Sequence, residues 1–220
     1  MNNMQGRLII LEGADGTGTT TQSKLLFAWL IKEYPKVEPV LTAEPTTSPV
    51  GRLLRDILNK SVHTRLGSRS MAALFYADRV EHFESVIQPS LDRGNWVICD
   101  RNWQSTLVYQ GITQSDSEAH WITSLHNGLI PKNSHCFILD TPLEVAQRRC
   151  RNRNEPKQLY ETEAFQACVL NAYRKLPSWD WKSEILSCGS ASSEEVHKML
   201  RNQIEHYYLH NVLNDNEQDQ

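Results

Sequence analysis

A glycine-rich segment near the N-terminus has the residue types that bind phosphate groups. It follows a short apolar segment and leads into a segment with helical periodicity. In this setting, backbone N–H groups at a helix N-terminus surround phosphate oxygens. Gly13 and Gly18 have the spacing of the GxxxxGK[ST] pattern. The sequence therefore predicts a phosphate-binding loop that contains Gly13, Asp15, Gly16, Thr17, Gly18, Thr19, Thr20 and Thr21.

Two hydroxyl residues decide what this loop can do. Thr20 occupies the position whose hydroxyl ligates Mg²⁺ in such loops. Thr19 occupies the position of the lysine whose ammonium neutralises phosphate charge as a phosphoryl group moves. Threonine is shorter and carries no charge. Two interpretations follow from the loop alone: another cation supplies the missing charge, or the protein binds a nucleotide without catalysis.

Short apolar segments alternate with helical segments along the chain. The candidate strands are Leu8–Leu11, Val37–Leu41, Trp96–Cys99, His135–Leu139 and Glu184–Cys188. The candidate helices are Thr20–Glu33, Val50–Leu58, Ser68–Gln88, one capped by Thr141, Glu161–Lys175 and Ser192–Leu209. This alternation predicts an α/β fold, with a parallel sheet of about five strands flanked by helices. We expect residues 1–220 to form one domain, with a frayed tail at 214–220.

Four residues follow candidate strands directly or closely, namely Gly13, Glu44, Asp100 and Asp140. Ligands of parallel α/β sheets bind beyond the carboxyl ends of the strands. We therefore expect these residues to lie together at one edge of the sheet.

Composition narrows the class of protein. The chain has 220 residues, 40% of them hydrophobic, and a formal net charge of −3, which suggests neither a nucleic-acid nor a membrane partner. Its apolar stretches fall short of the ~20 residues that a membrane-spanning helix needs. Its five cysteines include no CxxC pair, which favours reduced thiols and a cytoplasmic location.

Further motifs follow the loop in a fixed order. They are Ala43-Glu44-Pro45 with Pro49–Arg52, Leu74–Arg79, Cys99-Asp100-Arg101 with Ser105–Gly111, and Leu139–Arg149. Together with the loop, these motifs resemble those of the thymidylate kinase family of P-loop nucleoside-monophosphate kinases. The resemblance extends from about Leu8 to Leu176. It implies transfer of the ATP γ-phosphoryl group, with Mg²⁺, to dTMP or a related pyrimidine deoxynucleotide.

The resemblance also implies roles for individual residues. Asp15 matches an acid that contacts the acceptor sugar, and Phe75 matches a ring that stacks on the base. Arg79 and Arg101 match arginines that hold phosphate, and Asp100 matches an acid that organises Mg²⁺ with Thr20. The further acceptor-site candidates are Glu44, Pro45, Arg52, Ser105, Tyr109 and Gln110.

A basic segment occupies the place of the family's lid, at about residues 148–160. Its candidate catalytic arginines are Arg149, Arg151 and Arg153. The loop itself contains no arginine, so the chain is similar to the branch whose lid supplies it. We expect a lid arginine to replace part of the charge that is absent at Thr19.

The chain departs from the family pattern at several positions. Thr19 replaces lysine, Ala43 replaces arginine, and Asn102 with Trp103 follows the Asp-Arg pair where tyrosine is usual. These departures leave two questions open: which acceptor the protein prefers, and whether it only binds a nucleotide without catalysis.

Many relatives pair through long helices, so the resemblance also implies a homodimer through Ser68–Gln88.

Overall fold

The sheet is the frame of the molecule. The computed structural model describes residues 5–62, 64, 66–152, 159–160, 162–180 and 182–209. Five parallel strands form one sheet in the order β2-β3-β1-β4-β5. Their bounds are β1 Arg7–Glu12, β2 Val40–Ala43, β3 Trp96–Asp100, β4 Ser134–Asp140 and β5 Ser183–Ser187. The predicted α/β class with about five parallel strands is confirmed.

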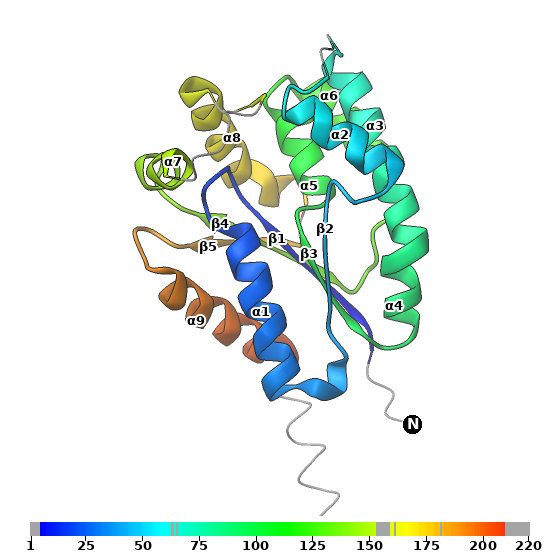
Figure 1. Cartoon of the computed structure of the whole chain (residues 1–220), viewed down its shortest axis with the longest axis vertical. Helices are drawn as coiled ribbons and strands as arrows, with labels where there is room; N and C mark the ends of the chain where they lie inside the picture. The colour runs from blue at the N-terminus through cyan, green and yellow to red at the C-terminus, as the bar shows by residue number, and fades with distance from the viewer. Residues whose placement is uncertain are drawn as a thin grey trace, which may run out of the picture.

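Helices cover both faces of the sheet (Figure 1). Their bounds are α1 Thr19–Glu33, α2 Pro49–Leu58, α3 Ser68–His82, α4 Gln88–Asp92, α5 Trp103–Thr106, α6 Asp116–Leu125, α7 Leu143–Arg151, α8 Glu163–Lys175 and α9 Ser193–Ile204. Single π-helical turns follow α3, α5 and α9, at Phe83–Ile87, Leu107–Ile112 and Glu205–Leu209. In the described part of the chain, no helix has the length and apolar character needed to cross a bilayer.

Alternation along β1 divides the core into two layers. Ile9 and Leu11 face one layer, where Leu26 and Leu30 of α1 and Leu200 of α9 pack against them. Leu8 and Ile10 face the other layer, which contains apolar residues of α3, α4, α6 and α8. Burial of both faces explains why the strands read as continuous apolar runs in the sequence.

Several predicted boundaries are wrong. Val37 lies in a 3₁₀ turn, Pro35–Val37, and β2 begins only at Val40. The long helix does not stop before Pro89: the π-helical turn Phe83–Ile87 lets the helical path continue as α4, with the proline in its first turn. Thr141 does not cap α7, because Pro142 holds the N-cap position without a side-chain hydrogen bond.

The sequence analysis also missed two helical segments, which lie beside the sheet's carboxyl edge. α5 begins at Trp103 and is capped by Asn102, whose side chain accepts from the Trp103 N–H. α6 is capped by Ser115, which accepts from the Glu118 N–H. The Ser115-x-x-Glu118 spacing was an available capping signal.

Candidate active site

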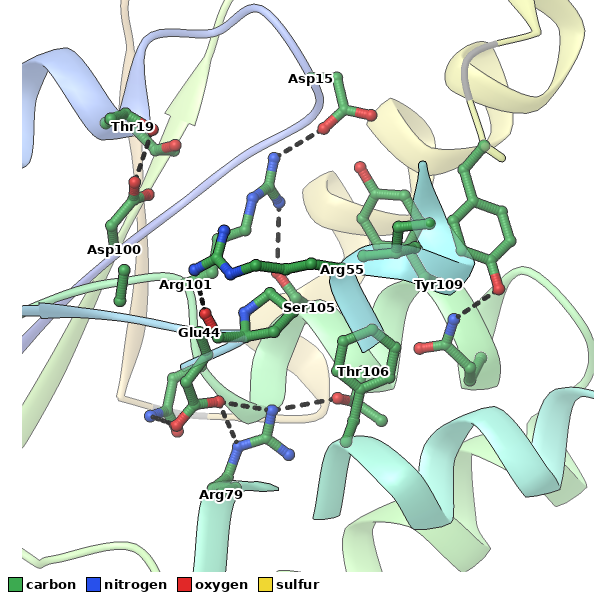
Figure 2. Close-up of a pocket in the computed structure, with 18 of the residues that line it drawn as sticks. Asp15, Thr19, Glu44, Arg55, Arg79, Asp100, Arg101, Ser105, Thr106 and Tyr109 are labelled. Atoms are coloured by element: carbon green, nitrogen blue, oxygen red, sulfur yellow. Dashed lines mark hydrogen bonds and ion pairs between the residues drawn. The ribbon is translucent and has the colours of Figure 1, made fainter. Parts of the chain in front are cut away.

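A large cavity lies at the carboxyl edge of the strands. Its volume is about 570 Å³, within the range of small-molecule sites. Most predicted site residues line it: Asp15, Gly16, Gly18, Thr19, Thr20, Thr21, Glu44, Pro45, Phe75, Arg79, Asp100, Arg101, Ser105, Tyr109 and Gln110. Asp15 and Arg79 lie on opposite sides of it (Figure 2).

Other predicted residues lie outside the cavity lining. Gly13 and Thr17 support the loop, since the Gly13 carbonyl accepts from Arg101 at 2.9 Å and the Thr17 hydroxyl donates to the Ala14 carbonyl at 2.8 Å. Among the described residues, Arg52 is exposed and does not line the cavity. Asp140 lies at the same edge of the sheet, where it pairs with Arg174 at 3.2 Å.

The loop leads directly from β1 into α1. Gly18 holds the N-cap position of α1 with φ 103°, a left-handed conformation that glycine adopts without steric cost. The first-turn N–H groups of a helix have no intrahelical partners, so those of α1 are free to face an anion at this edge. Gly16, with φ 87°, passes close to α7: a Cβ there would lie 2.3 Å from the Ala146 carbonyl oxygen.

Thr20 and Asp100 form a hydroxyl–carboxylate pair. Thr20 Oγ1 donates to Asp100 Oδ2 at 2.5 Å. The other carboxylate oxygen, Oδ1, is buried and has no hydrogen-bond partner among the described residues. Buried polar atoms usually have partners, so an unpaired carboxylate oxygen beside a hydroxyl fits a hard cation such as Mg²⁺.

Arg101 joins the loop to the base of the cavity. Its backbone has φ 69°, which turns the chain sharply after β3. The guanidinium donates to Asp15 Oδ1 at 2.8 Å, and also to Ser105 Oγ and Tyr173 Oη, each at 3.2 Å. These contacts hold the Asp15 carboxylate in place with a fixed positive charge beside it.

Glu12 supports this arrangement from below. It is fully buried and accepts from the Ser105 hydroxyl and the Tyr173 hydroxyl, both at 2.7 Å. Burial raises the pKa of Glu12, and the charge of Arg101 opposes that rise. The sequence analysis did not single out Glu12, because a carboxylate next to the loop glycine has no pattern of its own.

Arg79 is buried opposite the loop. Its Nε donates to Glu44 Oε2 at 2.8 Å, and its Nη2 donates to Thr106 Oγ1 at 3.1 Å (Figure 2). Glu44 also accepts from the Asn102 amide at 3.0 Å, which places the departure at Asn102 inside this network. The result is a cationic group held rigidly at the cavity wall, suited to a charge-assisted hydrogen bond to a phosphate.

Arg55 is a cavity residue that the sequence analysis missed. It lines the cavity from α2, and its guanidinium donates to the backbone carbonyls of Pro45 and Thr46. Arg52 lies three residues earlier on the same helix and instead donates to the Thr47 carbonyl at 2.6 Å. Arg55 stands four residues after Gly51, beyond the motif Pro49–Arg52 on which the sequence prediction was based.

The loop before α2 is fixed by Asp78 of α3. The Asp78 carboxylate accepts from the backbone N–H of Thr46 at 2.8 Å and from the Ser48 hydroxyl at 2.9 Å. Its burial and these contacts hold the segment that carries Glu44 and Pro45 against the cavity. Asp78 therefore orients the site without lining it.

Aromatic residues form the remaining wall. Phe75 lines the cavity and packs against the cluster of Leu54, Ile57 and Met71. Tyr109 contacts Tyr160 with ring centroids 5.5 Å apart, and Gln110 Nε2 donates to Tyr160 Oη at 3.2 Å. This wall offers a ring face and amide groups, as a planar base requires.

The predicted lid lies partly outside the described residues, which exclude Arg153 and positions up to 158. Arg149 donates to the Thr17 carbonyl at 3.4 Å and the Ala191 carbonyl at 3.1 Å, so it lies against the loop. Arg151 is exposed at the end of α7.

A second set of metal-ligating residue types occurs behind Arg79. Ligand atoms of Glu44, His82 and Cys99 lie within 4.8 Å of one another. These atoms already have hydrogen-bond partners: His82 contacts Glu44 at 3.0 Å and Thr42 at 2.6 Å, and Cys99 Sγ donates to the Arg101 carbonyl at 3.0 Å. We assign this cluster a structural role.

Comparison with known proteins agrees with this geometry. The model of the thymidylate kinase family matches residues 11–200. A probable thymidylate kinase of Pyrococcus abyssi is 35% identical over 94% of this chain and 99% of that protein. A thymidylate kinase of Akkermansia muciniphila is 36% identical over 90% of both chains.

Solved structures give the same result. The thymidylate kinase of Candida albicans superposes with a TM-score of 0.74 and 26% identity, over 91% of this chain and 92% of that one. The thymidylate kinase of Ehrlichia chaffeensis gives a TM-score of 0.71 and 27% identity, over 91% of this chain and 99% of that one. The chain therefore belongs to the thymidylate kinase family.

Proposed function

We propose that this protein transfers the γ-phosphoryl group of ATP to dTMP, or to a closely related pyrimidine deoxynucleoside monophosphate. The observation that supports this most is one cavity that holds the phosphate loop, the Thr20–Asp100 pair and Arg79. In such a cavity a donor phosphate at the loop and an acceptor phosphate at the arginines face each other. Phosphoryl transfer needs positioning and charge stabilisation rather than a covalent intermediate.

Individual residues have distinct proposed tasks. The backbone N–H groups of residues 15–20 hold the donor phosphates, and Thr20 with Asp100 holds Mg²⁺. Bound there, the ion neutralises charge on the donor phosphate oxygens. Arg79, Arg101 and Arg55 align the acceptor phosphate, and Phe75 with Gln110 contacts the base. Asp15 contacts the acceptor sugar.

The substitution at Thr19 defines the alternative, a nucleotide-binding protein without catalysis. Thr19 lines the cavity without a charge of its own, so the phosphates there need another cation. We propose that the basic segment of the lid, with Arg149, Arg151 and Arg153, supplies it. Closure of this segment would also exclude water that otherwise hydrolyses ATP.

An acceptor screen tests the proposal. The protein is incubated with Mg²⁺ and γ-labelled ATP beside dTMP, dUMP, 5-hydroxymethyl-dUMP, dCMP or dGMP, and labelled diphosphates are separated. We expect label in a pyrimidine diphosphate, with dTMP or a 5-substituted analogue first. Label only in inorganic phosphate, or in dGDP alone, would reject the assignment.

We also propose a cytoplasmic location and a homodimer. The absence of any CxxC pair among the five cysteines of the sequence supports a reducing compartment. For α3, the apolar residues Met71 and Ala72 are buried within the subunit, so pairing through this helix would use its exposed Ala73 and Ala77. Light scattering distinguishes one subunit from two.

A further inference from the structure

His126, at the end of α6, completes the set of contacts around Arg79. Its Nε2 lies 2.8 Å from Arg79 Nη1, and its Nδ1 lies 2.7 Å from the Ile122 carbonyl oxygen. A carbonyl oxygen only accepts, so Nδ1 carries the proton. Nε2 then has a lone pair and accepts from Arg79.

The His126 ring is held on two sides. Trp103 packs across it with centroids 5.4 Å apart and planes tilted by 30°. Tyr76 contacts it edge-on at 5.3 Å. The side chain is buried, at 4% exposure. The ring therefore presents Nε2 to Arg79 in one fixed orientation.

The hydrogen-bond partners of Arg79 show what its contact with His126 achieves. A guanidinium has donors on three nitrogens. Arg79 Nε and Nη2 both pair with Glu44, at 2.8 and 2.7 Å, Nη2 also donates to Thr106, and Nη1 donates to His126. With one Nη1 hydrogen directed to His126, the second hydrogen of the same planar nitrogen has a defined direction.

We propose that His126 is a positioning residue for dTMP binding, which holds Arg79 so that the second hydrogen of Nη1 meets the acceptor phosphate. This inference rests on the proposed function, in which Arg79 binds that phosphate. Burial and the charge of Arg79 lower the pKa of His126 to about 3, which keeps its ring neutral and able to accept at neutral pH.

A smaller cavity beside His126 allows a small molecule to be used in testing the role of this residue. It has a volume of about 210 Å³ and is lined by His126 and Trp103 together with Trp179, Asp180 and Lys182. Truncation of His126 enlarges this cavity toward Arg79. Imidazole is small enough to enter the enlarged space and to accept from Arg79 in place of the missing ring.

The test compares His126→Leu, His126→Gln and His126→Gly. Dissociation constants for dTMP and ATP are measured by calorimetry, and KM and kcat are measured where turnover occurs. We expect His126→Leu to weaken dTMP about tenfold, as loss of a hydrogen bond to a charged group does, with ATP affinity within twofold of the native value. His126→Gln retains an acceptor and should recover most of the affinity.

Imidazole addition separates positioning from folding. We expect millimolar imidazole to restore dTMP affinity in His126→Gly and to have no such effect on the native protein. The matched control is His120→Ala, which removes an exposed histidine of the same helix that contacts Trp179. Its dTMP affinity should be native.

Three results would overturn the proposal. They are native dTMP affinity in folded His126→Leu, an equal loss of dTMP and ATP affinity, and no imidazole rescue of His126→Gly. A native protein that binds dTMP without phosphorylating it would contradict the proposed function and leave the binding test of His126 intact. A native protein that does not bind dTMP would contradict both the proposed function and the proposed role of His126.

Discussion

At the residue scale, the positive charges of the cavity differ in how they are compensated. Arg79 is paired with Glu44 at 2.7 Å and Arg101 with Asp15 at 2.8 Å. Among the described residues, the hydrogen bonds of Arg55 go to neutral backbone carbonyls and not to a carboxylate. Arg55 lines the cavity, so its charge faces the space where a phosphate dianion would bind.

The first prediction concerns this uncompensated charge. Arg55→Ala should raise the KM for dTMP about 10- to 100-fold, since a charge-assisted hydrogen bond contributes roughly 1.5–3 kcal/mol. The KM for ATP should change little. Arg52→Ala is the matched control, because Arg52 belongs to the same helix and is exposed outside the cavity. Steady-state kinetics with equal effects in both variants would contradict the role of Arg55.

The second prediction concerns stability and pH. The pKa of His126 falls from 6.5 to about 3 in the fold. Between these values the unfolded chain binds the extra proton, so the free energy of unfolding decreases as the pH falls from about 6.5 toward 3. Arg79 faces the ring directly, and Asp180 and Lys182 lie across the smaller cavity.

Urea denaturation from pH 7 to pH 5 checks this dependence. The native protein should lose stability over that range, and His126→Gln should lose less of it. Parallel pH profiles for the two proteins would show that His126 is not a source of the dependence.

At the element scale, the phosphate loop packs against α7, the helix that carries Arg149 and Arg151. Gly16 has φ 87° and its α-carbon faces the Ala146 carbonyl and Cys150 Sγ of α7. A side chain there would displace backbone, because carbonyl positions inside a helix cannot shift alone. The lid arginines on α7 therefore depend on the loop conformation.

The third prediction follows from this contact. Gly16→Ala should raise the KM for ATP at least tenfold and lower kcat, as the loop moves away from α7. Gly128→Ala is the matched control: its φ of 81° is similar, yet a Cβ there meets nothing within 4 Å. Both variants carry the cost of a left-handed residue. Equal kinetics in the two would contradict a role for loop–helix packing.

The sequence predicted the buried elements well, because strands covered on both faces are continuously apolar. It did not predict α6: the helix is short, only its residues Ala119 and Ile122 are buried, and the capping by Ser115 is its clearest signal. It also placed the end of the long helix at Pro89, since a π-helical turn that accommodates a proline has no local signature. Periodicity reports burial, and it reports little about helix ends.

The candidate site, too, was predictable from the sequence only in part. The loop and Asp100 were predictable from their position after strands. The network around Arg79 was only partly predictable, because Thr106 and His126 are distant from Arg79 in sequence and belong to no motif. Arg55 was not predicted, because the face of α2 that lines the cavity depends on tertiary packing.

At the scale of the whole molecule, the sheet order β2-β3-β1-β4-β5 places the loop after β1 between the ends of β3 and β4, with β2 on the far side of β3. The Glu44 N–H donates to the Asp100 carbonyl at 3.1 Å, and the Arg101 N–H donates to the Leu11 carbonyl at 3.0 Å. The donor and acceptor sides are thus fixed by one rigid frame. Catalysis then depends on whether charge suffices without the loop lysine.

The most direct test measures ADP formation from Mg-ATP and dTMP by the native protein, by Asp100→Asn and by Thr19→Lys. We predict dTMP-dependent turnover by the native protein and a loss of about 100-fold or more in Asp100→Asn, as for removal of a group that stabilises transition-state charge. Thr19→Lys should leave the native rate unchanged or increase it. Native turnover no higher than that of Asp100→Asn, with activity only in Thr19→Lys, would contradict the account and identify a binding protein whose site lacks the catalytic charge.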